Sequence, residues 1–301
     1  MTTQRVLLVV NPRRKQAREL AQRMVGALQA ADVRVRMADD DLSGWPDGSA
    51  PDVEQVPADE HAADGCEVVV VLGGDGTILR GAERARSADV PLIGVNLGHV
   101  GFLAEAESED ADAVVDAIVH RRWRVEERVA LDIRILQGGT EIASTWALNE
   151  IAVEKIARQK IIEVLVEVDG RPLSRWGCDG VVAATPTGST AYAFSAGGPV
   201  VWPEVSALLV VPLSAHALFA RPLVVAPSSV IAFELLPWCE GVVSADGRRV
   251  IDVAPGSRIE VRQSAQPVRL ARLMSAPFTD RLVAKFSLPV EGWRGTRSQD
   301  R

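Results

Sequence analysis

The stretch VVVVLGGDGT, residues 68–77, decides the fold of the first third of the chain. Its five leading apolar residues predict a buried strand, and helical periodicity resumes after Thr77. Glycines between a buried strand and a helix let backbone N–H groups and the helix N-terminus approach phosphate oxygens. The stretch therefore predicts a parallel α/β sheet with a phosphate cradle that holds one carboxylate, Asp75, between Gly74 and Gly76.

This glycine loop matches neither of two common phosphate-binding motifs. A Walker A loop places Lys after its last glycine, whereas Ala82 follows Gly81 here. The dinucleotide fingerprint GxGxxG is absent as well. The loop by itself predicts phosphate binding and does not specify the nucleotide.

The sequence on both sides of the loop alternates strand and helix patterns. Arg5 to Val10 reads as a buried strand, Lys15 to Ala31 as an amphipathic helix, and Val33 to Met37 as a second strand. Another strand is expected at Leu92 to Val95 and a helix near Glu109 to His120. Strands separated by helices imply a parallel sheet, so residues 1–125 are predicted to form an α/β domain.

Residues 39–65 interrupt this alternation with an acidic composition. They include nine Asp or Glu, three Pro and three Gly, and neither Lys nor Arg. Such a composition buries little apolar surface. We expect a mobile, solvated loop.

From about residue 126 the pattern becomes that of an all-β domain. Val129, Leu131 and Ile133 alternate with polar or small residues, as in a half-buried strand. Asp169-Gly170 and Asp246-Gly247 lie between β-rich runs, which is typical of hairpin turns. Residues 126–275 are therefore predicted to be β-rich, and the pattern leaves open whether residues 276–301 return to the first domain.

Composition limits the possible partners and the compartment. The 301 residues include 33 Lys or Arg and 40 Asp or Glu, and the net charge of −7 argues against broad binding to nucleic acid or to anionic membranes. The most apolar long stretch, residues 205–220, is broken by Pro212, Ser214 and His216, so no membrane helix is expected. Three widely spaced cysteines without CxxC spacing favour reduced thiols and a cytoplasmic location.

A second unusual stretch is TPTGSTAYAFSAGGP, residues 185–199. It contains six hydroxyl groups within eleven residues, and its Tyr192 is the only tyrosine of the chain. Hydroxyls and backbone amides bind sugar and phosphate oxygens, while the tyrosine ring offers a flat packing face. The stretch predicts a site for a polar ligand that carries a flat ring.

Together, these motifs resemble the NAD kinase family, ATP-NAD 2′-phosphotransferases of the bacterial type. The family's hallmarks are a GGDGT loop and a hydroxyl-rich segment, and the connecting elements NLGHVGFLAE (residues 96–105), Asn149-Glu150 and Cys178-Asp179-Gly180 also fit. Diacylglycerol and sphingosine kinases share the GGDGT loop, whereas residues 179–199 are more specific. The resemblance covers most of residues 5–290 and implies a Rossmann-like N-terminal domain, a β-rich, sandwich-like C-terminal domain and NAD bound between them.

The resemblance also implies roles for individual residues. Asp75 matches the proposed general base, and Arg80 matches a basic site residue. Asn149 and Glu150 match a pair that contacts the dinucleotide ribose, and Asp179 matches a second ligand-binding aspartate. The other residues that match ligand-binding positions are Gly74, Gly76, Lys160, Thr187, Thr190, Ala191, Tyr192, Ala193, Phe194 and Ser195. The family position that Lys160 matches is occupied by varied polar or basic side chains.

Without the resemblance, several of these residues have simpler interpretations. Arg80 would be a helix-surface arginine, Asn149-Glu150 would be polar strand residues, and Arg248 would be a hairpin charge. Whether Lys160 and Arg248 contact a ligand stays open.

The reaction that the resemblance implies is attack of the adenosine 2′-hydroxyl of NAD on the terminal phosphoryl group of ATP or polyphosphate. Mg²⁺ is expected to be held mainly by the donor phosphates, because no cluster of carboxylates forms a protein-only cage. The family also implies a homodimer or homotetramer. Two alternatives stay open: a lipid kinase with the same GGDGT loop, and a non-catalytic dinucleotide sensor that does not need Asp75.

Overall fold

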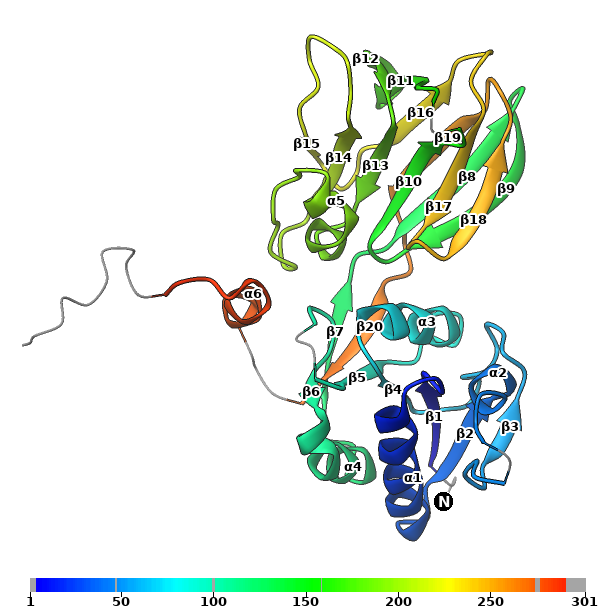
Figure 1. Ribbon diagram of the computed structural model, residues 1–301, viewed down its shortest axis with the longest axis vertical. Coiled ribbons are helices and arrows are strands. Elements are labelled where there is room, and N and C mark those ends of the chain that lie inside the picture. Colours follow the sequence, from blue (N-terminus) through cyan, green and yellow to red (C-terminus); the bar gives the residue numbers. More distant parts are fainter. Residues whose placement is uncertain (1–3, 47, 99–100, 158, 274–276, 291–301) are drawn as a thin grey trace, which may run out of the picture. The chain divides into compact units, whose positions relative to one another are not determined.

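The computed structural model describes residues 4–46, 48–98, 101–157, 159–273 and 277–290. The chain divides into two compact units, shown in Figure 1. Unit 1 comprises Met1–Glu126 together with Arg269–Arg301, and unit 2 comprises Glu127–Val268. No helix in the described ranges combines the length and the apolar character that crossing a membrane requires.

Unit 1 is built on a sheet whose described strands number eight, in the order β3-β2-β1-β4-β5-β20-β7, with β6 beside β5. The pairs β1/β2, β1/β4, β2/β3, β4/β5, β5/β6 and β5/β20 are all parallel. This confirms the parallel α/β prediction. The strands are β1 (Arg5–Val10), β2 (Arg34–Ala38), β3 (Glu54–Val56), β4 (Val68–Leu72), β5 (Leu92–Asn96), β6 (Ala106–Glu107), β7 (Arg124–Arg128) and β20 (Val268–Arg272).

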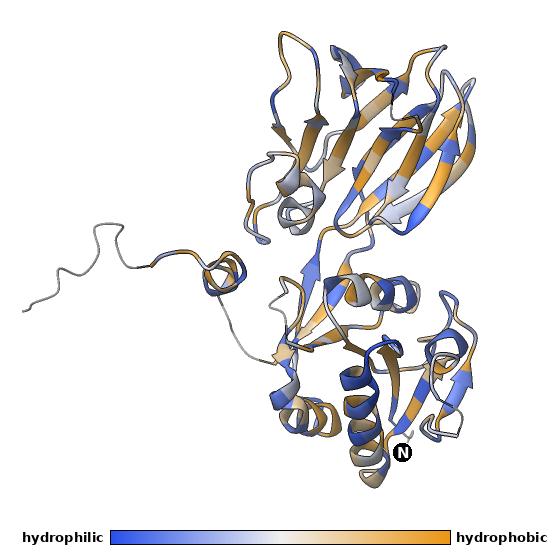
Figure 2. Ribbon diagram, in the orientation of Figure 1, coloured by the Kyte–Doolittle hydropathy of each residue, from blue (hydrophilic) through white to orange (hydrophobic). Residues whose placement is uncertain are grey.

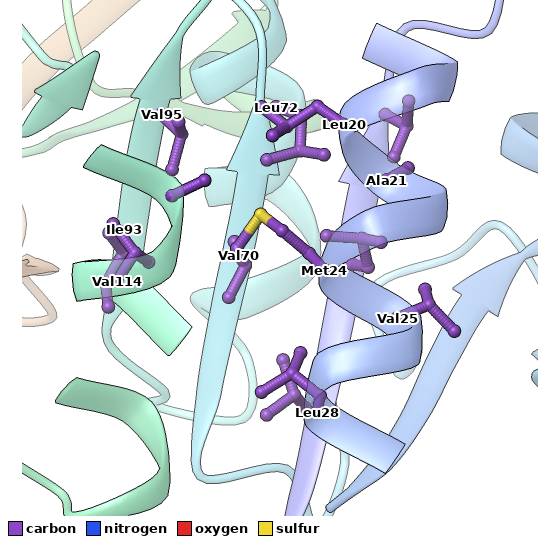
Figure 3. Close-up of a cluster of buried hydrophobic side chains, with 14 of the residues drawn as sticks. Leu20, Ala21, Met24, Val25, Leu28, Val70, Leu72, Ile93, Val95 and Val114 are labelled. Atoms are coloured by element: carbon purple, nitrogen blue, oxygen red, sulfur yellow. The ribbon is translucent and has the colours of Figure 1, made fainter. Parts of the chain in front are cut away.

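Helices cover this sheet on both faces, which explains why its central strands are mostly apolar. Val70 and Leu72 of β4 pack with Met24 of α1 and Val114 of α4 in one core (Figure 3). On the opposite face, Val71 lies against Gly81 of α3. Figure 2 shows hydrophilic residues along α1 and α3, as expected for helices with one face in water. The helices of unit 1 are α1 (Lys15–Ala30), α2 (Asp39–Leu42), α3 (Asp75–Ala85), the 3₁₀ turn η1 (Ser108–Asp110), α4 (Ala111–Val119) and α6 (Phe278–Phe286).

The acidic segment 39–65 is part of this fold, so the prediction of a mobile loop was wrong. It contains α2, and β3 extends the sheet through parallel pairing with β2. Asp41 is fully buried, where its carboxylate accepts hydrogen bonds from Arg84 Nη1 at 2.7 Å and from the Val10 backbone N–H at 3.2 Å. Arg84 of α3 thus supplies a positive charge beside Asp41, whereas residues 39–65 contain neither Lys nor Arg.

Unit 2 consists of two antiparallel sheets with six described strands each. Their inner faces share one core, in which Trp176 and Phe233 are the largest fully buried side chains. This confirms the sandwich-like, β-rich prediction. One sheet has the order β15 (Leu223–Val225), β14 (Leu208–Leu213), β13 (Gly180–Ala184), β10 (Glu150–Lys155), β17 (Gly241–Ala245), β18 (Arg249–Val253). The other has the order β12 (Arg171–Cys178), β11 (Ile162–Val168), β16 (Ile231–Leu235), β19 (Arg258–Gln263), β8 (Leu131–Gln137), β9 (Thr140–Ala147).

Both Asp-Gly dipeptides form hairpin turns, as predicted. Asp169-Gly170 joins β11 to β12, and Asp246-Gly247 joins β17 to β18. All four residues have φ between 53° and 71°, the left-handed region that two-residue hairpin turns require.

The last strand among the described residues, β20, lies in a different unit from the one that its sequence pattern suggested. β20 falls within the range 126–275 that reads as β-rich, yet Leu270 pairs with Leu92 of the unit 1 sheet. Five alternating residues fit either sheet equally well, so the local pattern does not choose between them. The helix α6 that follows also packs in unit 1.

Candidate functional site

The glycine loop connects the carboxyl end of β4 to α3. The helix begins at Asp75, and the backbone N–H groups of Thr77 and Ile78 donate to Gly74 O at 2.8 and 3.1 Å. Among the residues that the structure describes, and apart from the glycine's own chain neighbours, a Cβ atom built on Gly74 or Gly76 would meet no atom within 4 Å. Open space therefore adjoins the helix N-terminus, where anionic groups are stabilised.

The Asp75 carboxylate is held by the segment that follows β5. Its Oδ2 accepts the backbone N–H of Phe102 and its Oδ1 that of Leu103, both at 3.2 Å. A Cβ atom on Gly101 would lie only 2.4 Å from Asp75 Oδ1, so only glycine leaves room for the carboxylate there. The sequence marked residues 96–105 only as a connecting element and did not reveal this contact.

Arg80 lies on α3, five residues after Asp75. Its Nη2 donates to Val10 O at 2.6 Å and pairs with Asp41 Oδ1 at 2.6 Å. These contacts hold the guanidinium at the carboxyl end of β1, although one fifth of the side chain stays exposed. Asp41, which composition placed in a solvated loop, is thus the residue that orients Arg80.

In unit 2, Asn149 and Glu150 are both buried, at the start of β10. The carboxylate of Asp246 accepts the backbone N–H of Leu148 at 2.9 Å and that of Asn149 at 2.7 Å, and it also pairs with Arg249 at 2.9 Å. The sequence identified Asp246 only as a turn residue. Its φ of 53° satisfies the hairpin, while its side chain fixes the backbone of the Asn149-Glu150 pair.

The environment of Glu150 favours its neutral form. Burial raises the pKa of Glu150 to about 8, and the nearby Asp246 carboxylate adds to the rise, while a hydrogen bond from the Tyr192 backbone N–H opposes it. A protonated Glu150 offers an O–H donor as well as acceptor lone pairs.

This raised pKa predicts how stability depends on pH. Between the unfolded pKa of about 4.5 and about 8, the folded chain binds more protons at Glu150 than the unfolded chain does. The free energy of unfolding should therefore fall as pH rises through this window, with a slope of at most about 1.4 kcal/mol per pH unit from this group. Glu150→Gln should remove this component in urea titrations at pH 5 to 8.5. The exposed Glu204→Gln serves as control, and an unchanged slope in Glu150→Gln would contradict the assignment.

The hydroxyl-rich segment folds as the 3₁₀ turn η2 (Thr187–Thr190) and the short helix α5 (Tyr192–Ser195). Two of its hydroxyls stabilise the segment itself. Thr185 Oγ1 donates to Leu148 O at 2.6 Å and accepts from Gly188 N, and Ser189 Oγ accepts the Val201 N–H at 2.9 Å. The buried hydroxyls of Thr185 and Ser189 therefore stabilise the fold of the segment. The hydroxyl-rich composition, which predicted a ligand site, thus also reflects this structural role.

Several predicted residues gather around Tyr192. Its backbone N–H reaches Glu150, and its hydroxyl donates to Glu154 Oε1 at 2.7 Å. Its side chain remains partly exposed, as does that of Phe194, whereas Ala193 is buried. Thr187 is buried, and Thr190 Oγ1 donates to Thr187 O at 3.2 Å.

Asp179 is partly exposed and pairs with Lys155, a residue that the sequence did not indicate. The hydrogen bond from Lys155 lowers the pKa of Asp179. Lys160 is exposed in the loop between β10 and β11, and Arg248 is exposed in the β17–β18 hairpin. Neither Lys160 nor Arg248 is buried among the other candidate residues of unit 2.

Comparison with known proteins identifies the family. The ATP-NAD kinase N-terminal domain family matches residues 6–123, and the ATP-NAD kinase C-terminal domain family matches residues 148–273. The chain belongs to the ATP-NAD kinase family. This confirms the resemblance inferred from the motifs, and the chain is an enzyme of the NAD kinase class, a phosphotransferase that uses NAD and ATP.

Relatives and solved structures agree with this membership. The chain is 56% identical over 292 residues to NAD kinase 2 of Streptomyces coelicolor, covering 96% of each chain. It is 51% identical over 310 residues to the NAD kinase of Mycobacterium tuberculosis, covering 98% of this chain and all of the relative. A crystal structure of an NAD kinase from Archaeoglobus fulgidus with ATP is 26% identical, with a TM-score of 0.69 over 94% of this chain and 98% of the other. Yeast NADH kinase with NADH, at 24% identity, shares the fold with a TM-score of 0.85 over 96% and 89% of the two chains.

Proposed function

We propose that this NAD kinase transfers the terminal phosphoryl group of ATP, or of polyphosphate, to the adenosine 2′-hydroxyl of NAD with Asp75 as general base. The observation that carries this proposal is the Asp75 carboxylate, fixed by two backbone N–H groups at the N-terminus of α3 beside open glycine positions. Unit 1 carries the proposed reacting carboxylate and phosphate cradle, and unit 2 carries the residues that match the family's dinucleotide contacts.

The reaction forms a bond between the 2′-oxygen and the terminal phosphorus and breaks the bond from that phosphorus to its bridging oxygen, which leaves with ADP or with the shortened polyphosphate. The proton of the 2′-hydroxyl passes to Asp75. Because phosphoryl transfer goes through a loose transition state, positioning dominates and a modest base can accept the proton late. The backbone N–H groups of the glycine loop and the dipole of α3 stabilise phosphate charge. Arg80, held by Asp41, adds a positive charge near the end of β1.

Residues of unit 2 are proposed to bind the dinucleotide. Buried Asn149 and Glu150 offer hydrogen-bonding groups for ribose hydroxyls, and the partly exposed ring of Tyr192 offers a packing face. Asp179 and the segment from Thr187 to Ser195 extend these contacts.

Mg²⁺ is proposed as the metal, held mainly by the donor phosphates. Within the described residues, no group of three or more His, Cys, Asp or Glu side chains forms a metal cage. A single carboxylate beside open space suits an ion that keeps water and substrate oxygens as ligands. When bound, Mg²⁺ neutralises charge on the phosphates.

Tyr192→Ala is expected to weaken NAD binding more than it slows turnover. A lost packing face costs contact in the ground and transition states alike, so the Michaelis constant for NAD should rise while kcat changes little. Steady-state kinetics with varied NAD measures both. An unchanged Michaelis constant would remove Tyr192 from the binding site.

We propose a homo-oligomer, at least a dimer, in the cytoplasm. Large apolar side chains of unit 2 remain exposed between α5 and β15, where they offer surface to another copy: Phe194, Trp202, Val205, Leu218, Phe219 and Val224. The cysteines Cys66, Cys178 and Cys239 are free and buried, which suits a reducing compartment. Light scattering at assay concentration is expected to show a dimer or tetramer. A monomer with full activity would contradict this.

Transfer of labelled phosphate from ATP to a panel of acceptors tests the proposed function. NAD should accept the label and diacylglycerol should not. Label on diacylglycerol would favour the lipid kinase alternative. NAD binding without transfer to either acceptor would favour the dinucleotide sensor.

A further inference from the structure

The segment from Phe102 to Glu105 lies between the Asp75 carboxylate and two arginines, the buried Arg272 and the largely buried Arg281. The backbone N–H groups of Phe102 and Leu103 point to Asp75. The carbonyl groups of the same segment accept hydrogen bonds from Arg272 and Arg281. Arg272 Nη1 donates to Leu103 O at 3.3 Å, and Arg281 Nη1 donates to Phe102 O at 3.1 Å and to Ala104 O at 2.7 Å.

One peptide group connects Arg281 directly to Asp75. The carbonyl of Phe102 and the N–H of Leu103 belong to the same peptide unit, so Arg281 donates to one end of it while Asp75 accepts from the other. A cation on the carbonyl oxygen polarises the peptide and strengthens the hydrogen bond that its N–H makes. The positive charge of Arg281 thus acts on Asp75 through a single planar group.

Arg281 is fixed in place although it comes from the C-terminal helix. Its guanidinium side chain is 13% exposed and pairs with Glu105, which is 1% exposed and also pairs with Arg272. Phe278 and Phe286 of the same helix pack on the ring of Phe102, with centroid distances of 5.7 and 6.0 Å. The helix α6 therefore holds the segment both by its arginine and by its aromatic side chains.

We propose that Arg281 is a positioning residue for phosphoryl transfer, which acts by orienting and polarising the Phe102–Leu103 peptide that holds Asp75. This inference rests on the proposed role of Asp75 as general base. It assigns a function in the reaction to the C-terminal helix, whose residues touch neither the glycine loop nor the hydroxyl-rich segment in any contact described above.

The first test compares three variants of the full-length enzyme. Arg281→Met removes the charge but keeps a long side chain. We expect it to lower kcat about tenfold, which lies within the range of interaction energies measured between residues of one hydrogen-bond network. The Michaelis constants should change little. Arg281→Lys keeps the charge, but its ammonium group reaches fewer of the three acceptors, which are Phe102 O, Ala104 O and the Glu105 carboxylate. It should therefore recover part of the lost kcat. Lys285→Met, which removes a charge from an exposed position of α6, should leave kcat unchanged. Equal kcat values for Arg281→Met and the wild type would overturn the proposal.

A double-mutant cycle separates a positioning role from general support of the fold. If Arg281 acts through Asp75, Arg281→Met should change the residual turnover less than twofold in an Asp75→Asn background. The same tenfold loss in both backgrounds would overturn the proposal while leaving the role of Asp75 intact. Asp75→Asn with near wild-type turnover would instead refute the general-base role of Asp75 on which this inference rests.

Hydrogen exchange supplies a readout that does not depend on residual turnover. With Asp75 present, Arg281→Met should speed exchange of the Leu103 amide severalfold, and Lys285→Met should not. An unchanged Leu103 exchange rate in Arg281→Met would overturn the proposed connection between Arg281 and Asp75.

Discussion

Asp75→Asn is expected to lower kcat at least about a hundredfold, because removing a general base typically costs about 10² to 10⁴ in rate. The amide also presents only one acceptor oxygen to the two backbone N–H groups of Phe102 and Leu103, so one of the two loses its partner. Binding of NAD should persist, since the proposed dinucleotide contacts come from unit 2. Steady-state kinetics together with calorimetric NAD titration measures both effects.

A matched control for this variant is Asp112→Asn, which changes an exposed aspartate in the first turn of α4. Surface changes of this kind usually alter stability by about 0.5 kcal/mol or less, and kcat should not change. A folded Asp75→Asn enzyme with near wild-type turnover would leave the carboxylate only a structural role in the glycine turn.

Gly188→Ala is expected to destabilise unit 2 by about 3 kcal/mol or more and to abolish tight NAD binding. A Cβ atom at this position would lie 2.0 Å from the carbonyl oxygen of Asn149 and 2.4 Å from its carbon. That backbone cannot move freely, because Asn149 O accepts the Thr185 N–H at 2.9 Å. Overpacking against fixed atoms costs about 1 to 3 kcal/mol and sometimes more. Any relief of the clash also displaces the Asn149-Glu150 pair.

Urea unfolding and NAD titration check this prediction, with Gly177→Ala as the matched control in the same unit. A Cβ atom on Gly177 would meet only the end of the Ile161 side chain, at 3.3 Å, and Ile161 is half exposed and free to move. Gly177→Ala should therefore be close to neutral. Equal stability of the two variants would show that η2 can shift away from Asn149.

Much of the fold could be predicted because the deciding signals are local. The apolar run from Val68 to Leu72 ahead of a glycine turn is sufficient to predict a buried parallel strand. Asp169-Gly170 and Asp246-Gly247, which lie between β-rich runs, each mark a hairpin. The acidic segment was misjudged because its stabilising partners are remote. Asp41 is buried against Arg84, 43 residues away, and a composition window around residue 41 contains no such cation.

The candidate site shows the same division between local and remote signals. Asp75 and Tyr192 stand out by residue type and by their neighbours in the sequence. Asp246 did not stand out, because it lies 97 residues from its partner Asn149. Its place in an Asp-Gly turn also gave a sufficient reason for an aspartate at that position. Arg281 contacts Phe102 across 179 residues, and nothing in the helix around it indicates that partner.

The measurement that tests the central claim most directly is the position of the phosphate in the product made by the purified enzyme from NAD and ATP. Phosphorus NMR of the isolated product should show one phosphomonoester on the adenosine 2′-oxygen, and an NAD analogue that lacks the 2′-hydroxyl should accept no phosphate. A phosphate on any other oxygen, or transfer to the 2′-deoxy analogue, would contradict the account.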